Sequence, residues 1–208
     1  MIRPTVTLVI DAATAGLLTG LSLIIAIGAQ NAYVLRQGLL RSHVGPVVVV
    51  CALSDLLLIG AGVSGIGAIV DHADWVVTVV RWLGVAFLLW YAATTLLRAR
   101  HAEALAAEAG GATPRGRVIA RSVALTWLNP HVYLDTVLLL GSIANTHGST
   151  GRWWFAVGAG LASIVWFCGL GFGARLLAPL LGRPRSWQVL DVAVAVTMLV
   201  VAAELALG

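Results

Sequence analysis

Charged residues are scarce in this chain, and their scarcity excludes an ordinary soluble domain. Of the 208 residues, 11% are charged and 60% are hydrophobic, whereas a soluble domain has about 25% charged residues. A bilayer with a hydrocarbon core of about 30 Å needs about 20 apolar residues per helix. Several runs of that length fill the sequence, so most of the chain is expected inside a membrane.

Lysine is absent, and all thirteen basic residues are arginines. The formal net charge is +4, but the arginines gather near the ends of the apolar runs, which does not indicate nucleic-acid binding. Cys51 and Cys168 lie far apart and form no C-x-x-C, so no redox or zinc motif is expected. A Walker sequence and H-E-x-x-H are missing as well. We therefore expect no metal site, no cofactor and no enzymatic activity.

Six apolar runs predict six membrane-spanning helices. The expected spans are 6–29, 44–70, 75–97, 118–144, 153–177 and 189–207. A hydrophilic stretch separates the third span from the fourth. The sequence thus predicts an all-α integral membrane protein with a first three-helix repeat (1–97), a cytoplasmic linker (98–117) and a second three-helix repeat (118–208).

The arginines predict the orientation of these spans. Ten of them, Arg36 included, fall on the side of the first, third and fifth links, and only Arg3 and Arg152 fall on the opposite side. Arginine-rich links remain in the cytoplasm, so both termini are expected outside it. Asp191, at one end of the last span, is expected near water.

Two polar interruptions occupy matching places in the two halves. The motif NAYVL at 31–35 follows the first span, and the motif NPHVY at 129–133 interrupts the fourth. Pro130 would break a helix, and Gly28 is expected to act as a hinge before the first motif. Inverted repeats with interrupted helices in matching positions are typical of secondary transporters, which bind substrate at the repeat interface. We therefore expect the first and fourth helices to be broken.

Amide side chains at these interruptions are the first candidates for a binding site. Taken alone, Gln30 and Asn31 could equally be hydrated side chains at the membrane surface, but the matching interruption at Asn129 favours a site. Broken helices expose backbone N–H groups that suit a carboxylate, and carbonyl oxygens that suit an ammonium group. An α-amino acid carries both groups, so Gln30, Asn31 and Asn129 are expected to bind it, with Tyr133 beside them.

Acidic residues inside the apolar runs are the next candidates. Asp55 lies well inside the second span, where a carboxylate takes up a proton or seeks a cation. It is expected to face a cationic group of the substrate or to carry a coupling proton. The alternative is a structural role as partner of Arg81 or of a hydroxyl group. Asp135 and His131 are further ion-coupling candidates, although His131 could simply line the break.

The stretch GLSLIIAIGAQNAYVLRQG at 20–38 resembles the LysE/ArgO branch of the lysine exporter superfamily. The resemblance continues in Ser54 and Asp55, in RWLGVAFLLWY at 81–91 and in TWLNPHVYLDT at 126–136. The form GAQN is specific to this branch, because the related exporters of neutral amino acids have a PGPN-type sequence there. The resemblance implies export of L-lysine, L-arginine or close analogues across the bacterial inner membrane, driven by ion gradients.

The expected mechanism is alternating access by rocking of the two halves, with protons as the coupling ion. Export of a cation against an inside-negative potential costs about 2.3 kcal/mol per 100 mV, and antiport with one proton cancels this electrical cost. The sequence leaves the oligomeric state open, with a homodimer among the options.

Three other functions compete with this interpretation. A divalent metal exporter could use Asp55, Asp135 and His131 as ligands, although the Gln-Asn motif argues against it. A membrane thiol-redox carrier would use Cys51 and Cys168, which requires the two sulfur atoms to meet. A scaffolding subunit would leave the polar residues of the spans unexplained.

Overall fold

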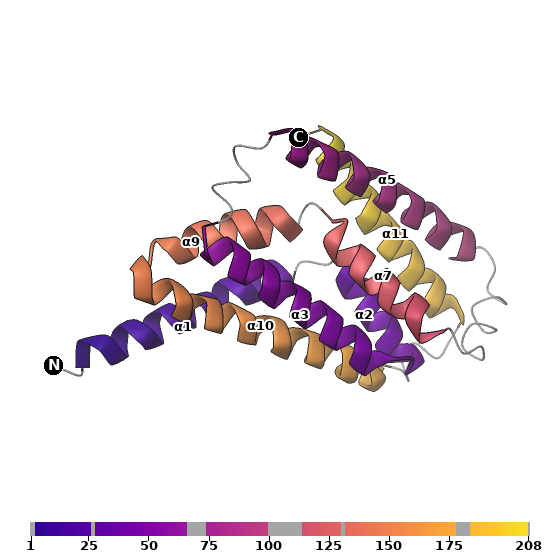
Figure 1. The fold of residues 1–208 in the computed structure, drawn as a ribbon. Coiled ribbons are helices and arrows are strands. Elements are labelled where there is room, and N and C mark those ends of the chain that lie inside the picture. The colour runs from indigo at the N-terminus through magenta and orange to yellow at the C-terminus, as the bar shows by residue number, and fades with distance from the viewer. Residues whose placement is uncertain are drawn as a thin grey trace. The chain divides into compact units, whose positions relative to one another are not determined.

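The computed structural model describes a chain that is helical almost throughout (Figure 1). The described residues are 3–25, 28–65, 74–99, 114–129, 132–177 and 184–207. Their helices are α1 (Arg3–Ile24), α2 (Ala29–Leu40), α3 (Val44–Val63), α5 (Asp74–Ala99), α7 (Arg115–Trp127), the π-helix η1 (Tyr133–Leu140), α9 (Gly141–Asn145), α10 (Gly148–Leu177) and α11 (Pro184–Leu207). No strand occurs in these ranges, and the all-α prediction is confirmed.

Three of the described helices are long and apolar enough to cross a membrane. Their spanning segments are Thr7–Ile24 in α1, Val44–Val63 in α3 and Gly148–Leu176 in α10. Helix α5 contains a shorter apolar stretch, Arg81–Leu97. These helices agree with a membrane protein, while the architecture of six spans in two inverted repeats remains a prediction.

A second helix follows the predicted first span after a break. Helix α1 ends at Ile24, and Gly28 has an extended backbone (φ −109°, ψ 171°) directly before α2. Glycine is tolerated at the residue that precedes a helix, which explains why the chain restarts there. The interruption expected near Asn31 therefore falls at Gly28, and Gln30 and Asn31 lie in the first turn of α2.

Helix α2 ends in a left-handed residue, Arg41, with φ 52°. The backbone N–H of Ser42 donates to the carbonyl oxygen of Gln37 at 3.0 Å, and that of Arg41 donates to Gly38 at 3.2 Å. This is the bonding of a Schellman-type helix end. At about 1.5 Å per residue α2 is about 18 Å long, which is too short to cross a hydrocarbon core of about 30 Å alone.

The second interruption also falls where the sequence predicts it. Helix α7 ends at Trp127, Leu128 and Asn129 lie outside any helix, and helical structure is present again at Val132. Pro130 and His131 lie outside the described residues. Each of the two predicted breaks therefore separates two consecutive helices of the chain.

The chain divides into two compact units. The first unit comprises Met1–Ala26, Ala52–Thr78 and His131–Phe167, and the second comprises Ile27–Cys51, Val79–Pro130 and Cys168–Gly208. Helices α3 and α10 each contribute one part to each unit. These compact units are not the two predicted repeats, which were defined by the expected symmetry of the chain. The boundaries of the repeats remain a prediction.

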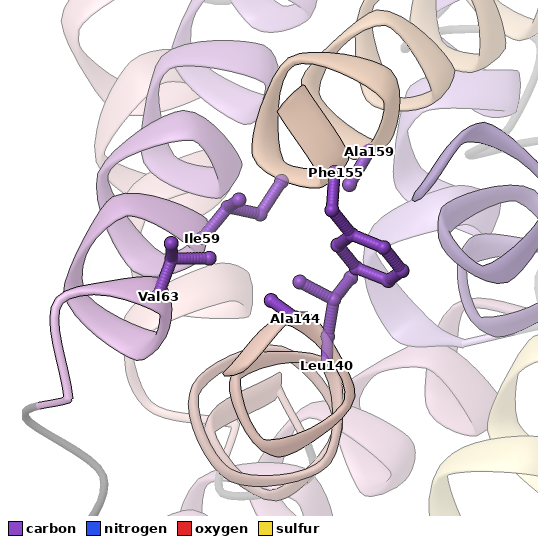
Figure 2. Close-up of a cluster of buried hydrophobic side chains, with 6 residues drawn as sticks. All are labelled: Ile59, Val63, Leu140, Ala144, Phe155 and Ala159. Carbon is purple, nitrogen blue, oxygen red and sulfur yellow. The ribbon is translucent and has the colours of Figure 1, made fainter. Parts of the chain in front are cut away.

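The first unit has an apolar core contributed by three segments of the chain. Figure 2 shows side chains from α3, from the η1–α9 segment and from α10 gathered around one ring: Ile59, Val63, Leu140, Ala144, Phe155 and Ala159. The ring is that of Phe155, which is fully buried. Apolar side chains gain little by leaving lipid tails, so tight packing of this kind is what holds helices together in a membrane.

Glycines bring the helices of the first unit into backbone contact. A Cβ atom on Gly158 of α10 would collide with the carbonyl oxygen of Ala13 in α1, and one on Gly16 would collide with the carbonyl oxygen of Phe155. Gly62 of α3 and Gly141 of α9 meet in the same way, since a Cβ on Gly141 would lie 2.7 Å from the carbonyl oxygen of Gly62. Small residues at such crossings let two backbones approach closely.

Candidate functional site

Helix α2 is buried on nearly every side, although it carries several polar residues. Nine of its twelve residues are buried, among them Gln30, Arg36 and Gln37. Burying polar side chains costs free energy unless they find partners, and such residues inside membrane segments are functional candidates by default. Helix α2 is therefore the element around which we place the candidate site.

The second unit surrounds α2 with three other helices. Gly38 packs against the backbone of Gly171 in α10. The Tyr33 hydroxyl donates a hydrogen bond to the carbonyl oxygen of Val118 in α7 at 3.3 Å. Helix α11 also contacts α2, and Figure 1 shows α2, α7 and α11 as neighbouring ribbons. These contacts fix the orientation of the polar residues on α2.

The predicted amide residues all lie in the second unit. Gln30 is 9% exposed, and its Nε2 atom has no hydrogen-bond partner in the part of the chain that the structure describes. Asn31 follows it and is half-buried. Asn129 is buried just beyond the end of α7, where its backbone N–H donates to the carbonyl oxygen of Thr126 at 3.4 Å. The buried amide nitrogen of Gln30 is thus a donor that a ligand could satisfy.

A buried ion pair in the second unit was missed by sequence analysis. Arg36 is 8% exposed and Asp191 is 1% exposed, and their Nη1 and Oδ1 atoms are 3.9 Å apart. The prediction that Asp191 lies near water is therefore wrong, and Arg36, assigned to the first link, is buried in a helix of that link. Sequence analysis missed the pair because the two residues are distant in the chain.

Asp55 is buried in the first unit, as predicted from its apolar flanks. It lies in α3, is 8% exposed, and its Oδ2 atom accepts a hydrogen bond from the Ser163 hydroxyl of α10 at 2.8 Å. A hydroxyl was one of the two structural partners anticipated for it. A hydroxyl stabilises a carboxylate without neutralising its charge, so this contact remains compatible with a cation or proton at Asp55.

The remaining candidates follow the second break. Tyr133 and Asp135 lie in the first turn of η1, and both are half-buried in the first unit. His131, like Pro130, is outside the described residues. The predicted site residues therefore divide between the units: Gly28, Gln30, Asn31 and Asn129 belong to the second, and Asp55, Tyr133 and Asp135 belong to the first.

The π-helical form of η1 is itself unusual. π-Helices are rare, occur mostly as short segments and are frequently found at functional sites. The widened turns lie where α3 approaches, since a Cβ atom on Gly62 would lie 2.7 Å from the carbonyl oxygen of Val137 and 2.9 Å from that of Thr136. The segment that carries Asp135 is thus held against α3, the helix that carries Asp55, within the first unit.

The competing site chemistries gain no support from the described residues. Within them, no group of three or more histidine, cysteine, aspartate or glutamate side chains could hold a metal ion. Cys51 is buried, Cys168 is half-buried, and both are free thiols.

Comparison with known proteins identifies relatives along nearly the whole chain. The family described as LysE type translocator matches residues 21–208. The lysine exporter LysE of Corynebacterium diphtheriae is 40% identical, over 93% of this chain and 97% of the relative. The arginine exporter protein ArgO of Salmonella schwarzengrund is 41% identical, over 92% of this chain and 91% of the relative. No solved structure matches this chain. These relatives are named as exporters, which are not enzymes.

Proposed function

This chain belongs to the family of LysE-type translocators, and we propose that it is a secondary active exporter of basic L-amino acids. One observation carries the proposal. The relatives named as a lysine exporter and an arginine exporter match it over more than nine-tenths of both chains. The substrates are then L-lysine, L-arginine or both, and the location is the bacterial plasma membrane.

The head group of the amino acid binds at the break before α2. The N-terminus of a helix is effectively positive and attracts a carboxylate. Gln30 supports this assignment because its buried Nε2 atom is a donor with no hydrogen-bond partner among the described residues. Asn31, Asn129 and Tyr133 complete the proposed set, and Gly28 and Pro130 act as hinges.

Proton antiport drives the export. A cationic substrate leaving against an inside-negative potential costs about 2.3 kcal/mol per 100 mV, and one proton entering cancels that cost. Asp55 either carries the proton or faces the cationic group of the substrate, with Asp135 and His131 as further candidates. Alternating access in an inverted-repeat architecture completes the proposal, with repeats at 1–97 and 118–208 and both termini outside. A homodimer is one option for the assembly.

Reconstitution into liposomes tests the function directly. The purified chain is assayed for counterflow of radiolabelled lysine and arginine, with leucine and a divalent metal as competing substrates, and with and without a pH gradient. We expect counterflow of the basic amino acids, and acceleration by a proton gradient directed opposite to the substrate flux. Absence of counterflow for both lysine and arginine would refute the proposal, and transport of the metal instead would favour a cation exporter.

Replacing Asp55 by asparagine separates its two proposed roles. If Asp55 carries the coupling proton, Asp55→Asn retains lysine counterflow but loses the response to a pH gradient. If it faces the substrate cation, counterflow is lost as well. The matched control is Asp11→Asn, which makes the same change at an exposed carboxylate of α1 and leaves both activities intact. Unchanged counterflow and unchanged pH response in Asp55→Asn would show that Asp55 has neither role.

A further inference from the structure

The buried pair of Arg36 and Asp191 forms a wall of a small cavity in the second unit. Tyr33, Tyr91 and Thr95 line the same cavity, together with two apolar residues. Its internal space admits about one water molecule in the conformation observed. Two aromatic rings and the ion pair line the cavity, and the amide residues and Asp55 do not.

The geometry of the pair is looser than that of a strong structural salt bridge. Charge-assisted N–H···O bonds are about 2.7–2.9 Å long, whereas Nη1 of Arg36 lies 3.9 Å from Oδ1 of Asp191. A buried pair repays its desolvation only when its geometry is excellent and further hydrogen bonds assist. The guanidinium thus faces the carboxylate at the outer limit of an ion pair, and Nε of Arg36 and Oδ2 of Asp191 have no hydrogen-bond partner among the described residues. Both groups therefore keep bonding capacity that a substrate could use.

The surroundings of Asp191 suit a guanidinium or an ammonium group. A buried carboxylate supplies the opposite charge, and tyrosine rings such as those of Tyr33 and Tyr91 attract cations through their π faces. In the observed structure the cation that fills this place is the side chain of Arg36 itself. The chemistry of the cavity is therefore already that of binding an arginine side chain.

We propose that Asp191, with Tyr33 and Tyr91, forms the subsite for the cationic side-chain group of the substrate, and that Arg36 occupies this subsite until the substrate displaces it. This inference rests on the proposed export of basic amino acids. Along α2, Asn31 and Arg36 are about 7.5 Å apart in axial rise, a length comparable with an extended lysine or arginine side chain. A head group at the start of α2 thus places its cation at the level of Asp191.

A double variant separates this role from a purely structural one. Arg36→Gln combined with Asp191→Asn leaves no buried charge, and neutral replacement of both partners of a buried pair is often harmless to stability. Folding is checked by size-exclusion chromatography and thermal melting in detergent. Reconstituted wild type and double variant are then compared for counterflow of L-lysine, and for competition by L-norleucine, which keeps the head group and chain but lacks the cation.

We expect the double variant to lose its preference for lysine, which has a cationic side chain, over norleucine, which has none. Its KM for lysine rises about tenfold or more, and norleucine becomes a competitor comparable with lysine. A folded double variant with an unchanged KM for lysine and no competition by norleucine would overturn the inference while leaving the export function intact. Failure of the wild type to exchange lysine or arginine would instead refute the export function.

A second variant decides the question if the double variant does not fold. Arg36→Gln alone removes the internal occupant and keeps Asp191 as a carboxylate for the substrate cation. It is purified with lysine present, because the buried carboxylate is otherwise left without a cation, and lysine is removed before melting. Adding lysine should then raise the melting temperature of Arg36→Gln more than that of the wild type, and norleucine should not. A lysine-induced shift equal to or smaller than that of the wild type would contradict the displacement of Arg36.

Discussion

Asp55 and Asp191 are both buried aspartates in long helices, but they are stabilised by different partners. Asp55 accepts a hydrogen bond from a neutral hydroxyl, that of Ser163, whereas Asp191 faces the guanidinium of Arg36. A hydroxyl leaves the charge of a carboxylate to be balanced by a proton or a cation, and a guanidinium balances it within the protein. This difference supports the tasks that we propose for them, proton coupling for Asp55 and exchange of one cation for another at Asp191.

The two units that contain these residues also differ in the side chains that they bury. The described part of the first unit is held by apolar side chains and by glycines whose backbones touch, as at Gly158 and Ala13. The second unit buries polar and charged side chains on α2, including Gln37. Close backbone packing also occurs in the second unit, at Gly38 and Gly171. The units therefore differ in the polar side chains that they bury rather than in how closely their helices approach.

The largest expected effect comes from removing the charge of one aspartate at a time. Asp191→Asn removes the carboxylate that Arg36 faces, and breaking a buried pair in this way costs about 3–5 kcal/mol of stability. Asp55→Asn removes no partner of a buried cation that the structure shows, so its cost should be about 1 kcal/mol. Thermal or denaturant unfolding of the two variants in the same detergent measures the difference. Equal destabilisation of both would remove the distinction between the two carboxylates.

The second expected effect tests the close packing of the first unit. Gly158→Ala places a methyl group against the carbonyl oxygen of Ala13, and overpacking of this kind costs about 1–3 kcal/mol. Gly169→Ala is the matched control on the same helix, because a Cβ atom there has nothing within 4 Å. It should be neutral or slightly stabilising, since alanine favours helix over glycine. Unfolding of both variants in one detergent is the measurement, and a neutral Gly158→Ala would show that the helices need not approach so closely.

Local chemistry in the sequence is what made the two breaks predictable. Pro130 cannot continue a helix, and Gly28 precedes polar residues in an apolar run, so each interruption has a cause within a few positions. The burial of Asp55 was predictable for a similar reason, because apolar residues flank it on both sides. Features that arise from neighbouring residues could thus be anticipated.

Partners that are distant in the chain could not be anticipated. Nothing near Arg36 indicates that its partner is Asp191, and nothing near Asp55 indicates that Ser163 donates to it. Tertiary packing decides these two contacts, and the sequence pattern carries no signal of them.

The smallest expected effect isolates the hydroxyl beside Asp55. Ser163→Ala removes the donor of a buried hydrogen bond and should cost about 1 kcal/mol. Ser142→Ala is the matched control in the same unit, because the hydroxyl of Ser142 is exposed and bonds only to its own helix, at the carbonyl oxygen of Leu139. That variant should stay within about 0.5 kcal/mol of the wild type.

Transport adds a second measurement to Ser163→Ala. If Asp55 is the proton carrier, loss of the hydrogen bond to its carboxylate changes the group that is protonated during transport. The response of lysine counterflow to pH should then move in Ser163→Ala and stay in place in Ser142→Ala. A pH response that does not move, in a variant that is measurably less stable, would assign the Ser163 contact to folding alone and would place the proton on another residue.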